Sequence, residues 1–353
     1  MRRGIRAGPL FTASKPSAAE FKTMDIRAAL PERHSKHQTS LVVAYIGDNA
    51  GRFAELLTMK APLPLLAGVA PSRQWLPAGP WATLLDFLQA QFPRIPTANW
   101  LSRLEQGKVV DENGQRLAAN SPYRAGACIF YYRELEAEIS IPFPERILYQ
   151  DEHLLAVDKP HFLPVQPAGR FLRETLLARL LNQGQPEGLA PLHRLDRETA
   201  GVVLFSRNPA TRGLYASLWQ QRKVRKVYEA LAPAPLQARD FPLLRCSRIV
   251  AGEPFFRMRE VAGTPNSETR LEIVESRQGG TLYRARPLTG RKHQIRLHFA
   301  ALGIPLVNDR LYPELRSAAA DDFSNPLQLL AKTISFPDPL TGQERSFASE
   351  LRL

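Results

Sequence analysis

Apolar positions in the first half of the chain follow a helical period and then change to short, strand-like runs. Residues 81–88 carry apolar side chains at helical spacing, and a second segment of the same kind surrounds Trp100. Residues 107–114 then form an apolar run that enters an Asn-Gly turn, and residues 125–132 form another. The pattern predicts a small module of two helices and a hairpin over residues 81–135.

The longer part after the Pro-Phe-Pro sequence at 142–144 alternates short apolar runs with few helical segments. Asn208 and Pro209 supply the cap and first-turn proline of one predicted helix. Residues 290–302 are predicted to form another helix that ends at Gly303. Strands are predicted at 147–149, 154–157, 202–205, 227–231, 271–274, 281–288 and 327–336. This alternation predicts an α+β domain built on one sheet.

The first 58 residues differ from the rest, because they are polar and basic with a single apolar stretch at 41–46. We therefore expect three parts: a poorly ordered extension at 1–58, a small module with linker at 59–140, and a main domain at 141–353. One hypothesis is that translation begins at Met24 or Met59, which the intact mass would test. The extension lacks the sustained apolar region of a secretory signal, although a mitochondrial-type presequence stays open on composition.

Charge and cysteine content narrow the classes of partner. The 47 Lys and Arg residues outnumber the 34 Asp and Glu residues, giving a net charge of +13, which favours polyanions such as nucleic acid. Charge alone is equally compatible with a basic protein of another kind. Cys128 and Cys246 form no Cys-x-x-Cys pair, so a disulfide scaffold and a thiolate zinc site are not expected. No apolar run approaches the ~20 residues that span a bilayer, and we expect a cytoplasmic protein.

The sharpest local signal is the segment 191–201, with the sequence PLHRLDRETAG. Asp196 stands just before a predicted strand, between Arg194 and Arg197. Nearby cations would keep this carboxylate ionised, as a site carboxylate requires. On spacing alone, an ion pair within a loop explains the segment more simply.

This segment resembles motif II of the RluA-type pseudouridine synthases, His-Arg-Leu-Asp-x-x-Thr-Ser-Gly, with Ala200 in place of serine. Four further segments resemble other motifs of that family in the same order. Phe162 and Asn308 stand where the family usually has glycine. The four segments are 158–165 (DKPHFLPV), 225–230 (RKVYEA), 288–298 (LTGRKHQIRLH) and 303–312 (GIPLVNDRLY).

The resemblance implies a mixed, mostly antiparallel sheet and an enzyme that isomerises uridines in structured ribosomal or transfer RNA. It implies that Asp196 acts on the nucleoside, as a covalent nucleophile or as a base that removes a sugar proton. It further implies that Arg296 holds Asp196 ionised and that Tyr228 faces the base. The base has to leave its stack, and Arg194 is expected to take the vacated space. Arg291 and His293 are expected to bind the substrate.

The isomerisation is redox-neutral and loses no group, so no cofactor and no metal are expected. The resemblance also implies a monomer. The module at 81–135 loosely resembles the S4 RNA-binding fold, and an unrelated α+β cap remains the alternative. Two rival functions stay open. One is a non-catalytic RNA-binding or RNA-folding factor, and the other is a retaining glycoside hydrolase. The latter needs a second carboxylate ~5 Å from the first, and none stands out beside Asp196.

Overall fold

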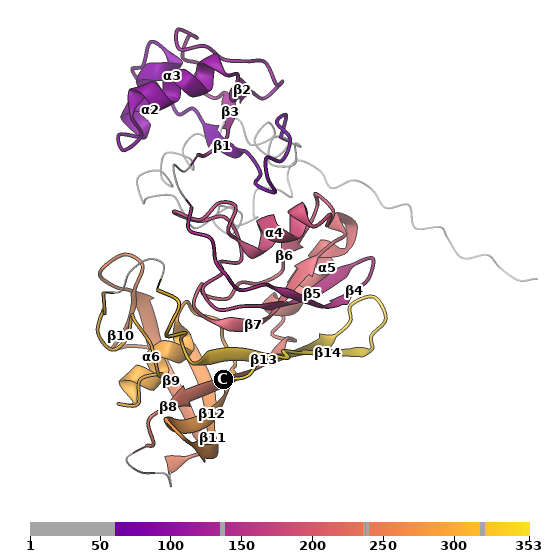
Figure 1. The fold of residues 1–353 in the computed structure, drawn as a ribbon, viewed down its shortest axis with the longest axis vertical. Helices are drawn as coiled ribbons and strands as arrows, with labels where there is room; N and C mark the ends of the chain where they lie inside the picture. The colour runs from indigo at the N-terminus through magenta and orange to yellow at the C-terminus, as the bar shows by residue number, and fades with distance from the viewer. Residues whose placement is uncertain (1–60, 135–137, 236, 238–239, 318–321) are drawn as a thin grey trace, which may run out of the picture.

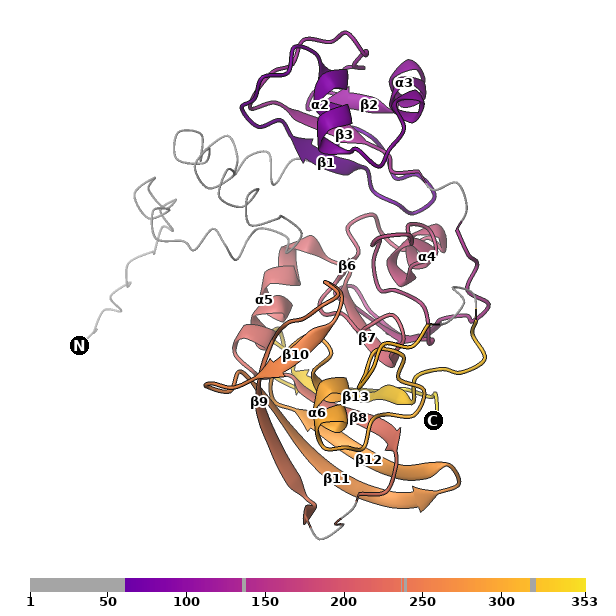
Figure 2. The same cartoon turned by 90° about the vertical axis from the view of Figure 1, so that its left-hand side faces the viewer.

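The computed structural model describes residues 61–353, except 135–137, 236, 238–239 and 318–321. Our predictions for residues 1–58 therefore lie outside the described residues. Both views place the small module at one end of the molecule, next to α4, and the large sheet beyond it (Figures 1 and 2). Within the part of the chain that is described, no helix has the length and apolar character needed to cross a bilayer.

The small module has the two helices and the hairpin that the sequence predicts, with one additional strand. Its sheet has the order β1-β3-β2 and is antiparallel throughout. Thr83 caps the first helix in a capping box with Asp86, so this helix begins at Leu84 and not at residue 81. Phe87 and Trp100 are fully buried against the sheet. The elements are β1 (Ser72–Trp75), α2 (Leu84–Gln91), α3 (Thr97–Glu105), β2 (Val109–Asp111) and β3 (Cys128–Tyr131).

The main domain is built on one 11-stranded mixed sheet, as predicted. Nine strands follow the order β10-β9-β11-β12-β8-β13-β7-β5-β4, and β14 and β6 pair with β13 and β7. Only β13 and β7 run parallel among the described pairs. The strands are β4 (Arg146–Gln150), β5 (Leu154–Lys159), β6 (Ala190–Pro191), β7 (Ala200–Ser206), β8 (Arg225–Ala232), β9 (Leu243–Ala251), β10 (Met258–Val261), β11 (Ser267–Arg277), β12 (Gly280–Pro287), β13 (Leu329–Pro337) and β14 (Glu344–Ala348).

Three helices cover the two halves of this sheet. Helices α4 (Leu176–Asn182) and α5 (Pro209–Gln220) pack on opposite faces of β5 and β7, because successive residues of these strands belong to different core clusters. Helix α6 (Gln294–Ala301) packs on β8, β11 and β12 (Figure 2). The two halves meet where β7, β13 and β8 lie side by side, and the residues of interest gather there.

The predicted helix at 290–302 is wrong in its first turn. His293 has a φ of 57°, in the left-handed region, and the helix begins only at Gln294. Within α5, Tyr215 and Leu218 are buried, whereas Leu214 is exposed. Helix α4 and strands β6, β9, β10 and β14 were not predicted.

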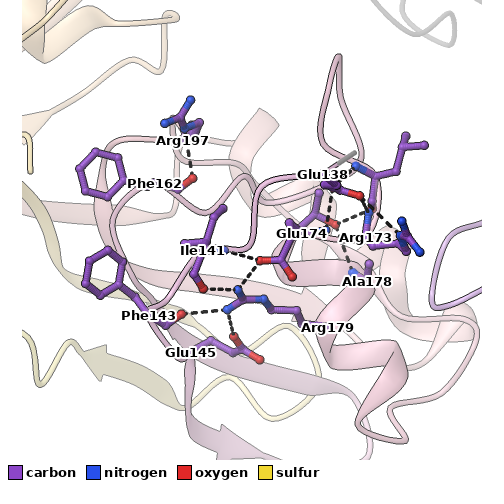
Figure 3. A network of polar contacts seen from close by, with 12 residues as sticks. Glu138, Ile141, Phe143, Glu145, Phe162, Arg173, Glu174, Ala178, Arg179 and Arg197 are labelled. Atoms are coloured by element: carbon purple, nitrogen blue, oxygen red, sulfur yellow. Dashed lines mark hydrogen bonds and ion pairs between the residues drawn. The ribbon is translucent and has the colours of Figure 1, made fainter. Parts of the chain in front are cut away.

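The linker between the two parts is fixed to the main domain (Figure 3). Arg179 of α4 donates hydrogen bonds to the carbonyl groups of Ile141 and Phe143, at 2.7 and 2.8 Å. It also forms ion pairs with Glu145 and Glu174, at 3.0 and 2.6 Å. One side chain, itself anchored by Glu174, therefore holds residues 141–145, where the linker meets the main domain, at three points.

Candidate active site

Asp196 lies in the loop between β6 and β7, at the junction of the two halves of the sheet. The Thr199 amide donates a hydrogen bond to the Asp196 carbonyl at 3.2 Å, which closes a tight turn. Gly201 follows with a φ of 114°, and a Cβ atom there would collide with the backbone of Ala331 in β13. Glycine is needed at this close approach of β7 to β13. The turn leaves the Asp196 side chain 29% exposed.

Arg296 of α6 is the buried cation beside Asp196. Its Nη1 atom lies 3.8 Å from Asp196 Oδ2. Its Nε and Nη2 atoms donate to the two oxygens of Asp309, at 2.8 and 2.6 Å. Burial alone would lower the pKa of Arg296, but the hydrogen bonds and charge of Asp309, with the charge of Asp196, raise it above its ordinary value. The guanidinium is therefore charged and fixed in place.

A second carboxylate, Glu198, also accepts a hydrogen bond from Arg296 Nη2, at 3.0 Å. The sequence had suggested no acid as a partner for Asp196, and the structure brings both Glu198 and Asp309 to the same guanidinium. Each is engaged as an acceptor, so neither is placed to donate a proton to a leaving group. A retaining hydrolase requires such a donor, and this arrangement does not favour that rival.

His293 precedes α6 and approaches Asp196 from the other oxygen, with Nε2 3.8 Å from Oδ1. The Tyr312 hydroxyl accepts a hydrogen bond from the Met258 amide at 2.7 Å, so its proton is available for His293 Nδ1, 2.8 Å away. This assigns the imidazole proton to Nε2, the atom that faces Asp196. Burial lowers the pKa of His293 to about 4, against the opposing charge of Asp196. The ring is a neutral donor at neutral pH.

Tyr228 lies on β8, paired with Ala331 of β13. Burial raises the pKa of its phenol, and the negative charge of Asp196 raises it further. The hydroxyl therefore stays protonated, within range of the Asp196 charge. The structure thus brings together Asp196, Tyr228, Arg296 and His293 out of the six predicted site residues.

Lys159 lies in the segment 158–165, but the sequence alone indicates no role for it. Its side chain is fully buried. Its ammonium group donates to the carbonyls of Pro160 and Leu163, at 2.9 and 2.8 Å, and of Arg197 at 3.2 Å. Burial lowers the pKa of Lys159 to about 7, while the charge of Asp196 acts to raise it. Lys159 therefore ties the Asp196 loop to the end of β5.

The two remaining predicted site residues lie at the surface. Arg194 and Arg291 are both exposed, and Arg291 donates from Nε to the Asn266 carbonyl at 3.1 Å. His193 accepts a hydrogen bond from the Leu204 amide at 3.1 Å, which braces the loop before Asp196 against β7. His298 is buried among hydroxyl groups. Across residues 61–353, with the gaps given above, no group of three or more potential ligands is placed to hold a metal.

Both replacements of a family glycine fall at left-handed backbone positions. Phe162 has a φ of 66° and Asn308 a φ of 62°. The Phe162 ring is buried between Phe143 and Phe323, with centroids 6.1 and 5.2 Å away. Its carbonyl accepts a hydrogen bond from Arg197 Nε at 3.2 Å (Figure 3). The residues differ from the usual glycines, but the backbone conformation that glycine favours is kept.

Comparison with known proteins agrees with these motifs. Residues 153–301 match the sequence profile of the family described as RNA pseudouridylate synthase. An uncharacterized RNA pseudouridine synthase of Synechocystis is 31% identical over 65% of this chain and 79% of its own. The dual-specificity RNA pseudouridine synthase RluA of Vibrio vulnificus is 34% identical over 57% of this chain and 80% of its own. The ribosomal large subunit pseudouridine synthase C of Haemophilus ducreyi is 32% identical over 59% and 66%, respectively.

Proposed function

Because the chain belongs to the RNA pseudouridine synthase family, we propose that it isomerises specific uridines in structured ribosomal or transfer RNA, with Asp196 as the group that acts on the nucleoside. One observation carries the assignment to Asp196. Its carboxylate lies 3.8 Å from a buried arginine that Asp309 holds in place. The name of the relative from Haemophilus ducreyi refers to the large ribosomal subunit, which supports ribosomal RNA as one candidate substrate.

The reaction detaches the base from the ribose, turns the base, and rejoins the two through carbon 5. Asp196 starts the reaction by attacking the nucleoside or by removing a sugar proton. Arg296 places its positive charge 3.8 Å from the carboxylate. His293 presents a neutral N–H group, which restrains the second carboxylate oxygen without adding charge. Tyr228 offers a ring to the base and a protonated hydroxyl group beside Asp196.

The target uridine has to leave its stack to reach Asp196, which costs a few kcal/mol. Arg194 is exposed on the same loop, two residues before Asp196. We assign to Arg194 the space that the flipped nucleotide leaves, and to Arg291 and His293 contacts with the substrate.

The domain division at 59–140 and 141–353 is part of the proposal, and so is an S4-like role of the small module in holding RNA. Arg179 fixes residues 141–145, where the two parts join, at three points. A fixed linker would let the module present RNA at a defined angle to the Asp196 loop. We further propose that the protein acts as a monomer in the cytoplasm.

Isomerisation replaces the hydrogen on carbon 5, so RNA made with tritium at that position releases tritium on turnover. The assay uses total RNA of cells that lack this gene, labelled at uridine carbon 5. We expect tritium release with the wild-type chain and none with Asp196→Asn. A matched control is Asp322→Asn, which removes a carboxylate paired with Arg310 at 2.9 Å and should leave release unchanged.

Binding of the same RNA separates the rival function. Asp196→Asn should keep the affinity of the wild-type chain, because the amide has almost the same shape. Release by Asp196→Asn at the wild-type rate would remove Asp196 from its role. An absence of release by the wild-type chain, with RNA binding intact, would favour the non-catalytic RNA-binding factor.

A further inference from the structure

A second hollow of about 260 Å³ lies outside the Asp196 cluster. The end of α5, the start of β8 and the turn that follows β12 form its walls. Its lining contains one large aromatic side chain, three basic side chains and no carboxylate. The lining residues are Trp219, Arg222, Val224, Lys226, Leu288, Thr289, Gly290 and Arg291.

Lys226 is the most informative of the three basic residues. Burial lowers the pKa of its ammonium group, and the residues that line the hollow include no carboxylate that could pair with it. A partly buried cation without a countercharge is unfavourable unless a ligand supplies that charge. The lining therefore suits an anion.

Arg222 gives an independent sign that the hollow has a function. It follows the C-cap of α5 in a Schellman arrangement, in which its amide donates to Trp219 O and the next amide donates to Leu218 O. This position has a left-handed backbone and usually holds glycine. Arg222 occupies it with a φ of 55°. Backbone strain of this kind is commonly retained where the side chain serves a function.

Each wall of the hollow carries a residue that lies close along the chain to a residue of the Asp196 site, or that stacks on a neighbour of one. Lys226 stands two residues before Tyr228 on the same face of β8, about 6.6 Å along the strand. Arg291 stands two residues before His293. Trp219 stacks on His193, three residues before Asp196, with ring centroids 5.5 Å apart. A ligand that fills both places is therefore a chain with closely spaced anionic groups.

We propose that this hollow binds the nucleotide next to the flipped uridine, with the phosphate between Arg222, Lys226 and Arg291 and the base against Trp219. The inference rests on the proposed function and adds a subsite to it. Basic side chains that position phosphates, together with an aromatic surface for a base, are the usual elements of single-stranded RNA binding.

The test uses the full chain and a labelled single-stranded oligouridylate, whose dissociation constant is measured by fluorescence anisotropy at several KCl concentrations. Loss of base stacking in Trp219→Ala should weaken binding roughly 5- to 150-fold, whereas Trp219→Phe should retain most of the affinity. Lys226→Met should lower the slope of log affinity against log salt by about 0.7, the value for one phosphate contact. Arg277→Met, an exposed arginine at the tip of the β11–β12 hairpin, is the control and should change neither quantity.

Arg222→Gly separates binding from folding. Glycine suits the left-handed position, so this variant should melt at or above the wild-type temperature while binding oligouridylate more weakly. In the tritium assay, these variants should raise the apparent KM and leave kcat near its wild-type value, because the subsite binds ground state and transition state alike.

Wild-type affinity and salt slope in both Lys226→Met and Arg222→Gly would overturn the subsite. A fall in kcat alone, with affinity unchanged, would overturn it too. The proposed function can fail separately: if the wild-type chain releases no tritium but oligouridylate binding depends on Lys226 and Trp219, the subsite stands and the isomerase assignment does not.

Discussion

Replacing Asp309 with asparagine tests whether a buried ion pair holds the site together. Asp309 is 2% exposed and accepts four hydrogen bonds. Two come from Arg296, at 2.8 and 2.6 Å, and two from the amides of Leu311 and Tyr312, at 2.8 and 3.1 Å. Asparagine has nearly the same shape, but its amide nitrogen must face at least one of these donors, and the charge that Arg296 needs is lost.

Breaking a buried ion pair by removing one partner costs about 3–5 kcal/mol. Glu198 and Asp196 remain near Arg296, so the lower end of that range applies. At about 2–4 °C per kcal/mol for a domain of this size, the melting temperature should fall by roughly 6–12 °C. Arg296 should also move toward Glu198, and misplacement of a site group by ~1 Å can cost about 100-fold in rate.

The assay combines thermal unfolding, followed by circular dichroism, with tritium release from RNA. Glu275→Gln is the matched control, because it removes one carboxylate from an arginine pair that is exposed to solvent, at 2.6 Å. Exposed pairs contribute about 0–1 kcal/mol, so this variant should behave as wild type. If Asp309→Asn melted within about 2 °C of wild type and turned over normally, Asp309 would not be the residue that fixes Arg296.

Three further predictions concern the linker, the left-handed positions and pH. Arg179→Met should lower the free energy of unfolding by about 3 kcal/mol, because it leaves the Glu145 carboxylate buried without the Arg179 charge. It also removes the hydrogen bonds that hold the linker, so limited proteolysis should then cut within residues 138–145. Phe162→Gly should lower the free energy of unfolding by about 2 kcal/mol, since the cavity left by the ring outweighs the relieved backbone strain. Asn308→Gly should change the free energy of unfolding, measured by urea titration, by less than about 1 kcal/mol, because only one hydrogen bond to Pro326 is lost. Burial lowers the pKa of His298 to about 4 in the folded chain, whereas the unfolded chain binds the proton near pH 6.5. The free energy of unfolding should therefore fall by about 3 kcal/mol between pH 6.5 and 4. If His298→Gln lost stability with pH as steeply as the wild-type chain, this histidine would not be the source.

The periodic pattern predicted most of the elements that form the junction of the sheet. Val202 to Phe205 is a continuous apolar run, and it became β7, whose two faces are both covered. Val227 to Leu231 is an apolar run interrupted by Glu229, and it became β8, whose Ala230 and Ala232 are buried. The hydrophobic pattern did not predict strands in which many residues are polar. Strand β9 alternates buried and exposed residues with several arginines, and its pairing with β11 is decided by contacts distant in sequence.

The pattern also failed at the start of α6, for a physical reason that concerns the site. The segment before Gln294 looks helical by composition, but His293 adopts a left-handed conformation that breaks the helix. This turn brings Nε2 of His293 toward Asp196 while Nδ1 meets Tyr312. A conformation stabilised by Tyr312, 19 residues later, cannot be read from the local sequence.

The roles of Lys159 and Asp309 were missed for a related reason. Each lies within a segment that the resemblance singles out, yet a buried lysine or aspartate is recognised only from its partners. Lys159 makes three hydrogen bonds to carbonyl groups, and two of the four that Asp309 accepts come from α6. Sequence motifs therefore located the site, while the hydrogen bonds that fix its geometry required the fold.

Phe162 and Asn308, which stand where the family usually has glycine, show that a motif can keep its backbone conformation when a side chain changes. A mismatch at Phe162 or Asn308 would ordinarily count against the resemblance. Both residues keep the left-handed backbone, which is unfavourable for phenylalanine and tolerated by asparagine. At Phe162, burial of the ring between Phe143 and Phe323 offsets the strain, and the Phe162 carbonyl still receives Arg197 from the Asp196 loop. Because the carbonyl direction depends on the backbone and not on the side chain, the loop next to Asp196 is held in the same way with either residue.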